Sequence, residues 1–169
     1  NLLIANPRDF PGFVRELAKH RFHYFTGVNT LFAGLLNTPG FSDLDFSSLR
    51  LTIGGGMAGQ EAVSKRWKQV TGRHIIQGYG LTETSPSAVV VPIDTEEFDG
   101  STGLPISSTE VRICDDDGND VARGGVGEIC IRGPQVMEGY WQKPDETAQV
   151  MLPGGWFRTG DIGRMDDRG

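Results

Sequence analysis

The segment whose residue types most clearly indicate a binding or catalytic role is "GYGLTET", which runs from Gly78 to Thr84. Tyr79 supplies a flat aromatic ring, and the glycine on each side removes a Cβ atom, so the backbone can come close to a ligand. Thr82 and Glu83 add a hydroxyl and a hard anionic oxygen on adjacent residues. Such groups bind a phosphate and its Mg²⁺. A solvated turn between two strands is the alternative interpretation of the same residues.

A second glycine-rich segment, "GGGMAG" at residues 54–59, satisfies the G-x-G-x-x-G pattern of a dinucleotide-binding turn. That pattern also needs an acidic residue about twenty positions further on, where it holds the ribose hydroxyls. Here the next strand ends at Ile76, Gln77 and Gly78, without a carboxylate. A tight strand-to-helix turn is therefore the better interpretation of these glycines.

The sequence around both loops predicts an α/β layer over residues 1–94. Asp9 marks the start of one helix and Gly72 the end of another, while "FHYFTGV", "LRLTI" and "HIIQ" are typical of short strands. Strand, glycine turn, helix and strand form a βαβ unit, which implies a parallel sheet with ligands at the carboxyl ends of its strands. Residues 54–59 and 78–80 are therefore expected at one edge of that sheet.

Residues 95–169 predict a mostly antiparallel, β-barrel-like subdomain that is truncated at its C-terminal end. The strand-like segments "TEVRIC", "GEICIRG" and "GWFRTGD" are separated by turns, with a short helix from about Pro144. The first residue is not Met and the final "RMDDRG" is typical of a hairpin tip, so we expect a fragment. The acidic turn at residues 115–120 does not fit a calcium loop, because Ile113 and Gly124 would occupy the first and twelfth ligand positions.

The composition of the chain argues against some classes of partner and favours one cellular compartment. The 169 residues include 16 basic and 22 acidic side chains, for a net charge of -6, without a Lys/Arg cluster, which argues against nucleic acid. No apolar run approaches the length of a membrane span, and the N-terminus lacks a signal-peptide pattern. Two cysteines are too few for a disulfide framework, so we interpret them as reduced packing residues. The expected location is the cytoplasm, with peripheral contact at the inner membrane as an open alternative.

Four motifs in order resemble those of adenylate-forming enzymes, the superfamily of acyl-CoA synthetases, luciferases and adenylation domains. They are "QGYGLTETSP", "GLPI", "GEICIRGPQVMEGYW" and "GWFRTGD". The sequences "GPQVMEGYWQKPDET" and "LDFSSLRLTIGGGM" are most similar to those of bacterial long-chain fatty-acid CoA ligases. The resemblance covers essentially the whole chain, which would be an internal piece of the large N-terminal domain of such an enzyme.

The resemblance implies a role for each residue of the opening segment. Tyr79 would stack on adenine, with Gln77 and Gly78 near the edge of the purine. Thr82 would contact the α-phosphate and Glu83 would hold Mg²⁺, so these two are the expected catalytic residues. Further positions follow from the same resemblance: a wall of the nucleotide site at Gly54, Gly55 and Gly56, a further cofactor-binding position at Gly80, the ribose hydroxyls at Asp161, and the acyl pocket at Thr26, Gly27 and Val28.

The activity implied is that of an ATP-dependent, AMP-forming acyl-CoA ligase that uses ATP, Mg²⁺ and coenzyme A. The family's phosphate loop and lysine-bearing C-terminal domain are expected outside this chain, which would therefore be inactive alone. Small molecules are the expected partners, and a homodimer of the full-length enzyme stays open. The alternatives are another acyl- or aryl-CoA ligase of the superfamily, or a non-catalytic module that retains the fold.

Overall fold

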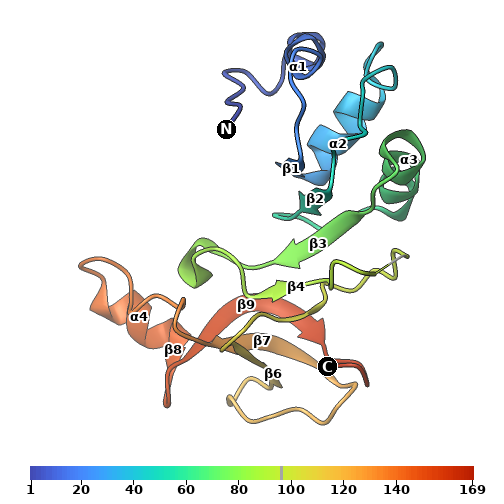
Figure 1. Cartoon of the computed structure of the whole chain (residues 1–169). Coiled ribbons are helices and arrows are strands. Elements are labelled where there is room, and N and C mark those ends of the chain that lie inside the picture. The colour runs from blue at the N-terminus through green and yellow to red at the C-terminus, as the bar shows by residue number, and fades with distance from the viewer. Residues whose placement is uncertain (96) are drawn as a thin grey trace. The chain divides into compact units, whose positions relative to one another are not determined.

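The computed structural model describes residues 1–95 and 97–169, in two compact units (Figure 1). The first unit contains Asn1–Gly78 and Val91–Gly103, and the second contains Tyr79–Val90 and Leu104–Gly169. The sequence predicted one division between residues 94 and 95, whereas these units alternate along the chain. The subdomain division itself stays a prediction. Each unit is described below by itself.

The first unit is the predicted α/β layer with parallel strands. Gly54 pairs with Gly27 on one side and with Gln77 on the other, so three neighbouring strands end at the same edge. The last residue of the third strand, Tyr79, already belongs to the second unit. The elements are α1 (Phe10–Leu17), β1 (Tyr24–Gly27), α2 (Asn29–Leu36), β2 (Leu51–Gly54), α3 (Glu61–Thr71) and β3 (Ile75–Tyr79).

The helix ends of this unit follow from local chemistry. Asp9 caps α1, and its Oδ1 accepts a hydrogen bond from Gly12 N at 3.0 Å. Gly72 ends α3 in the left-handed conformation, with φ of 74°, and its N–H donates to Lys68 O at 2.8 Å. Both helix ends predicted from the sequence are confirmed.

An aromatic core holds the helices against the parallel strands. Trp67 of α3 is fully buried, and its ring centre lies 4.8 Å from that of Phe32 and 5.4 Å from those of Phe25 and Phe41. Its indole N–H donates to Thr52 Oγ1 of β2 at 3.2 Å, so the one polar atom of the ring is satisfied. This packing fixes α3 directly behind the glycine-rich turn that precedes it.

The second unit is mostly antiparallel, as predicted. It contains a four-stranded sheet in the order β6-β7-β9-β8 and the antiparallel β4–β5 pair. The elements are the 3₁₀ turn η1 (Thr82–Thr84), β4 (Val89–Val90), β5 (Leu104–Pro105), β6 (Glu110–Cys114), β7 (Val126–Arg132), α4 (Pro144–Val150), β8 (Met151–Leu152) and β9 (Trp156–Arg164).

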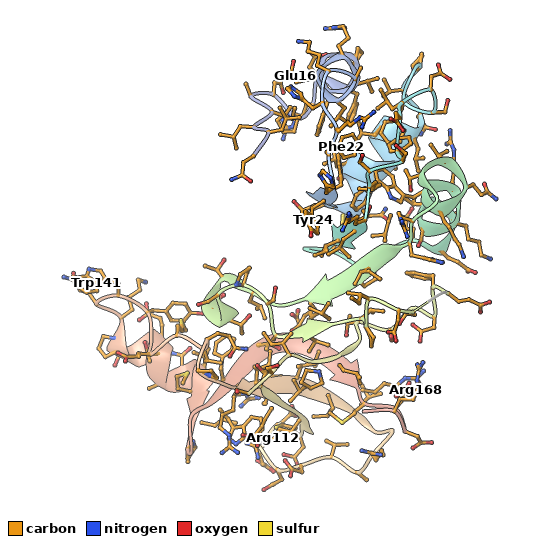
Figure 2. The ribbon with its side chains drawn as sticks, viewed as in Figure 1. Glu16, Phe22, Tyr24, Arg112, Trp141 and Arg168 are labelled. Carbon is orange, nitrogen blue, oxygen red and sulfur yellow. The ribbon has the colours of Figure 1, made fainter. Side chains whose placement is uncertain are left out.

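The second unit has a small apolar core of its own, and a cluster of charged and aromatic side chains lies on its four-stranded sheet. Ala88, Val89 and Ile131 are buried together, and Cys114 and Cys130 are buried free thiols, as the sequence predicted. On β6 and β7, the guanidinium groups of Arg112 and Arg132 lie 4.4 and 4.6 Å from the centre of the Trp156 ring. Arg112 is labelled in Figure 2. Arg132 also forms a two-point ion pair with Glu110, at 2.9 and 2.6 Å.

Within the described residues, no helix has both the length and the apolar character required to cross a membrane.

Candidate functional site

In the first unit, the structure brings the predicted acyl-pocket and glycine-turn residues to one sheet edge. Gly55 N donates to Gly27 O at 3.2 Å, directly beyond the paired positions Gly27 and Gly54. Val28 follows immediately and lies close to Gly56: a Cβ built on Gly56 would be 3.5 Å from Val28 Cγ1. Thr26 and Val28 are exposed at this edge. These residues can therefore line one surface, as their proposed roles require.

The glycines of this edge are needed because other groups approach their backbone closely. A Cβ on Gly55 would lie 3.2 Å from Gly78 O, and one on Gly59 would lie 2.6 Å from Gln77 Oε1. Gly56 has φ of 76°, a conformation that favours glycine. The expectation that both glycine-rich segments meet at one edge is confirmed for residues 54–59 and Gly78.

In the second unit, the loop after Tyr79 is closed by contacts to its own backbone. Tyr79 O accepts from Ala88 N at 3.0 Å, and a Cβ on Gly80 would lie only 1.9 Å from Pro86 O. Thr84 is fully buried, and its Oγ1 accepts from Leu81 N at 2.9 Å. The turn therefore has little freedom to change its path.

This closed turn determines how the two expected catalytic residues are presented. Thr82 is exposed and Glu83 is half-buried, one residue before the buried Thr84. Thr84 was missed in the sequence analysis, because the usual capping box has Glu or Gln at the third position of the turn, where Thr84 stands. Its buried hydroxyl supports the loop that carries Thr82 and Glu83.

The structure also joins two predicted nucleotide-binding residues that are far apart in the sequence. The hydroxyl of Tyr79 donates to Asp161 Oδ2 at 2.8 Å. Burial raises the pKa of Tyr79 well above its ordinary value, and the Asp161 carboxylate raises it further. The phenol therefore stays protonated and keeps donating at physiological pH, while the exposed Asp161 retains lone pairs for other donors.

Glu83 has a partner that the sequence analysis did not predict. The hydroxyl of Tyr140 donates to Glu83 Oε1 at 2.9 Å, and this bond raises the pKa of Tyr140. Met137 N donates to Glu83 O at 2.8 Å, so the same segment contacts both the backbone and the side chain of Glu83. Tyr140 is held in turn by Thr147 of α4, whose Oγ1 accepts from Tyr140 N at 2.9 Å. In the sequence, Tyr140 stood out only as a member of the family motif that ends in "MEGYW".

The carboxylate of Glu83 could serve as a ligand for Mg²⁺ that is bound together with a phosphate. Mg²⁺ is usually held by one or two carboxylates together with substrate phosphates and water. Among the described residues, the Glu83 carboxylate accepts one hydrogen bond, from Tyr140 on Oε1, which leaves acceptor sites on both oxygens. The described residues contain no cluster of three or more His, Cys, Asp or Glu side chains arranged for a metal ion.

Comparison with known proteins then identifies the family. The family model described as "AMP-binding enzyme" matches residues 2–141. The chain belongs to the AMP-binding enzyme family. The fold class and the superfamily predicted from the sequence motifs are therefore confirmed, and the rival dinucleotide-binding interpretation of residues 54–59 is not favoured.

Curated members of this AMP-binding family are similar over the whole chain. The long-chain-fatty-acid--CoA ligase of Yersinia pestis is 56% identical over 169 residues, which is 100% of this chain and 30% of that protein. The enzyme of the same name from Haemophilus influenzae is 51% identical over 166 residues, 98% of this chain and 29% of that protein. The chain thus spans less than a third of the length of these relatives.

The solved structure of a CoA ligase supports the fold. The anthranilate CoA ligase AuaEII, in complex with anthranoyl-AMP, superposes with a TM-score of 0.89 at 28% identity. The match covers 99% of this chain and 32% of that one. The secondary structure described above is therefore the arrangement found in an adenylate-forming enzyme.

Proposed function

We propose that this chain is the part of a long-chain fatty-acid CoA ligase that binds the adenosine and the α-phosphate of ATP. The observation that carries the proposal is the hydrogen bond between Tyr79 and Asp161. Base and ribose are adjacent in a nucleoside, so a ring that stacks on adenine and a carboxylate that accepts from the ribose must lie side by side. The identity of 56% to a ligase of this name, over the whole chain, supports the choice of activity.

Within the second unit, each proposed role matches the chemistry of the group. The Tyr79 ring stacks on adenine, beside the Gly80 backbone. Asp161 accepts from the ribose hydroxyls, and the exposed Thr82 hydroxyl donates to the α-phosphate. Glu83 is the metal ligand, because its carboxylate is presented by a rigid turn and has free acceptor sites.

Within the first unit, the remaining proposed positions lie at the strand edge. Gly54, Gly55 and Gly56 border the nucleotide, and Gln77 and Gly78 lie at the purine edge. A Cβ on Gly55 would lie 3.2 Å from Gly78 O, and Gly56 has φ of 76°, so both positions favour glycine. This supports a role in which the backbone comes close to a ligand. The acyl pocket includes Thr26 and Gly27 at the end of β1 and Val28 directly after it; Thr26 and Val28 are exposed.

The reaction proceeds in two balanced steps. A carboxylate oxygen of the fatty acid forms a bond to the α-phosphorus of ATP, and pyrophosphate leaves. The sulfur of coenzyme A then bonds to the acyl carbon, AMP leaves, and the thiol proton passes to solvent. Mg²⁺, when bound, would neutralise charge on the phosphates. Thr82 and Asp161 hold the nucleotide in place during the first step, so that the two reacting groups stay aligned.

The cellular setting is proposed on the same basis. A cytoplasmic location agrees with two buried free thiols, since reduced cysteines are usual in that compartment. Peripheral contact with the inner membrane and a homodimer stay predictions. An aryl-CoA ligase is the second candidate within the family, and the higher identity to the long-chain-fatty-acid--CoA ligases favours the fatty acid.

The test is substrate-dependent adenylation by the full-length protein that contains these residues. Pyrophosphate release would be measured with ATP and each of three carboxylates: a long-chain fatty acid, a short-chain acid and anthranilate. Release that depends on the long-chain acid, followed by formation of its CoA thioester, supports the proposal. Release with anthranilate alone would favour the aryl-CoA ligase, and a folded protein that releases pyrophosphate with no carboxylate would overturn the function.

A further inference from the structure

The strand that carries Asp161 pairs irregularly around this residue. Glu128 of β7 pairs with Ile162 of β9, but Cys130 pairs with Arg158. Ile129 alone on β7 therefore faces residues 159–161 on β9. Such a bulge turns side chains away from their regular alternation along a strand. It sets the direction of Asp161.

The carboxylate of Glu128 accepts hydrogen bonds from two residues of this bulge. Glu128 Oε1 accepts from Gly160 N at 2.8 Å, and Glu128 Oε2 accepts from Arg158 Nε at 2.6 Å. The side chain of Glu128 is only 12% exposed. Gly160 has φ of 77°, and the bulge removes its N–H from the regular strand pairing. Glu128 thus satisfies a donor that the sheet leaves without a backbone partner.

Asp161 is fixed by neighbours of the same bulge. Its N–H donates to Thr159 Oγ1 at 3.1 Å, and the Thr159 hydroxyl donates to Ile129 O at 2.8 Å. On the other side, Asp161 Oδ2 accepts from Tyr79. Glu128 does not touch Asp161 in any of these bonds. It holds the residues on either side of Thr159, and so the backbone from which Asp161 projects.

We propose that Glu128 is the positioning residue for ribose recognition by Asp161. The inference rests on the proposed function, because it assumes that Asp161 accepts from the ribose hydroxyls. A carboxylate that accepts two hydroxyl donors depends on its orientation, since hydrogen bonds weaken steeply as their angles become poor. When Glu128 no longer holds Gly160, the bulge relaxes and Asp161 loses that orientation.

The test compares two nucleotides that differ only at the ribose. Glu128→Gln is made in the full-length protein, and binding of ATP and of 2′,3′-dideoxy-ATP is measured by calorimetry. Glutamine has the same size, but one oxygen becomes an NH₂ group, so either Gly160 N–H or Arg158 faces a donor. We expect the Kd for ATP to rise about five- to tenfold, because part of two charge-assisted hydrogen bonds is lost. The Kd for the dideoxy nucleotide should change less than about twofold, because that ligand makes neither bond.

Glu110→Gln is the matched control. Glu110 forms a similar two-point ion pair with Arg132 on the same sheet, at 2.9 and 2.6 Å, but this pair does not involve the bulge. Its variant should bind both nucleotides like the parent. Glu128→Asp is the second variant, because it keeps the charge but is too short to reach both partners.

The outcomes separate the inference from the function beneath it. Selective weakening of ATP in Glu128→Gln or Glu128→Asp supports the positioning role. Equal weakening of both nucleotides in both Glu128 variants, while Asp161→Asn weakens ATP more than dideoxy-ATP, would mean that Glu128 has only a structural role. If Asp161→Asn itself weakens ATP and dideoxy-ATP equally, the ribose role of Asp161 fails, and the proposed function must be revised first.

Discussion

The hydroxyl of Tyr140 donates to the carboxylate of Glu83 at 2.9 Å, across 57 positions of the sequence. The donor fixes one carboxylate oxygen and leaves acceptor sites free for a cation. A ligand whose second partner orients it loses less side-chain freedom when the metal binds. Tyr140 should therefore matter to metal binding, although it lies outside the proposed set of ligands.

Tyr140→Phe should weaken metal binding without unfolding the protein. In the full-length protein with saturating ATP, we expect the apparent Kd for Mn²⁺, measured by EPR, to rise about tenfold, at the lower end of the effects known for groups that orient metal ligands. Tyr24→Phe is the control, because Tyr24 is 68% exposed. An unchanged Mn²⁺ affinity in Tyr140→Phe would show that the phenol does not orient Glu83.

Glu83→Ala should impair adenylation far more than stability, because it removes a metal ligand on a loop rather than a core side chain. We expect pyrophosphate release per folded molecule to fall at least about tenfold, with little change in thermal midpoint. Glu146→Ala is the control, since Glu146 of α4 forms an exposed ion pair with Lys143, the residue before that helix. A variant that unfolds readily but retains normal turnover when folded would contradict the metal role.

Gly80→Ala should distort the loop that carries Thr82 and Glu83. The added Cβ would lie 1.9 Å from Pro86 O, a backbone atom that cannot move alone. We expect a loss of about 1–3 kcal/mol in unfolding free energy, measured by urea denaturation, together with weaker ATP binding. In the control Gly133→Ala, the nearest atom is Oε1 at the end of the Gln135 side chain, and the nearest backbone atom, Ser108 O, is 3.2 Å away. Equal stability of both variants would indicate that the loop tolerates a shift.

Tyr79 should make the stability of the protein fall at alkaline pH. Its pKa is raised in the folded state, mainly by burial, so the folded protein holds this proton more tightly than the unfolded chain does. The stabilisation is complete below the pKa of an unfolded tyrosine, and it is lost as pH rises above that value. Between about pH 9 and about pH 12, the unfolding free energy of the parent should fall more steeply than that of Tyr79→Phe. Equal slopes would contradict this assignment.

Local chemistry determined most of the secondary structure. The Asp9 cap and the Gly72 stop act through hydrogen bonds to residues three or four positions away, so the sequence alone predicts them. The apolar strand segments and the glycine turn between them likewise implied a parallel sheet, and β1, β2 and β3 form one. The order of the motifs further identified the family.

Only the tertiary structure decided which functional groups touch. The contacts Tyr79–Asp161, Glu83–Tyr140 and Glu128–Gly160 join residues 82, 57 and 32 positions apart. The last of these depends on how β7 pairs with β9, where the register shifts around Ile129. Pairing over such distances is set by the packing of whole strands, and neighbouring residues in the sequence do not encode it. The types of the reactive side chains could therefore be predicted, but their supporting partners required the folded chain.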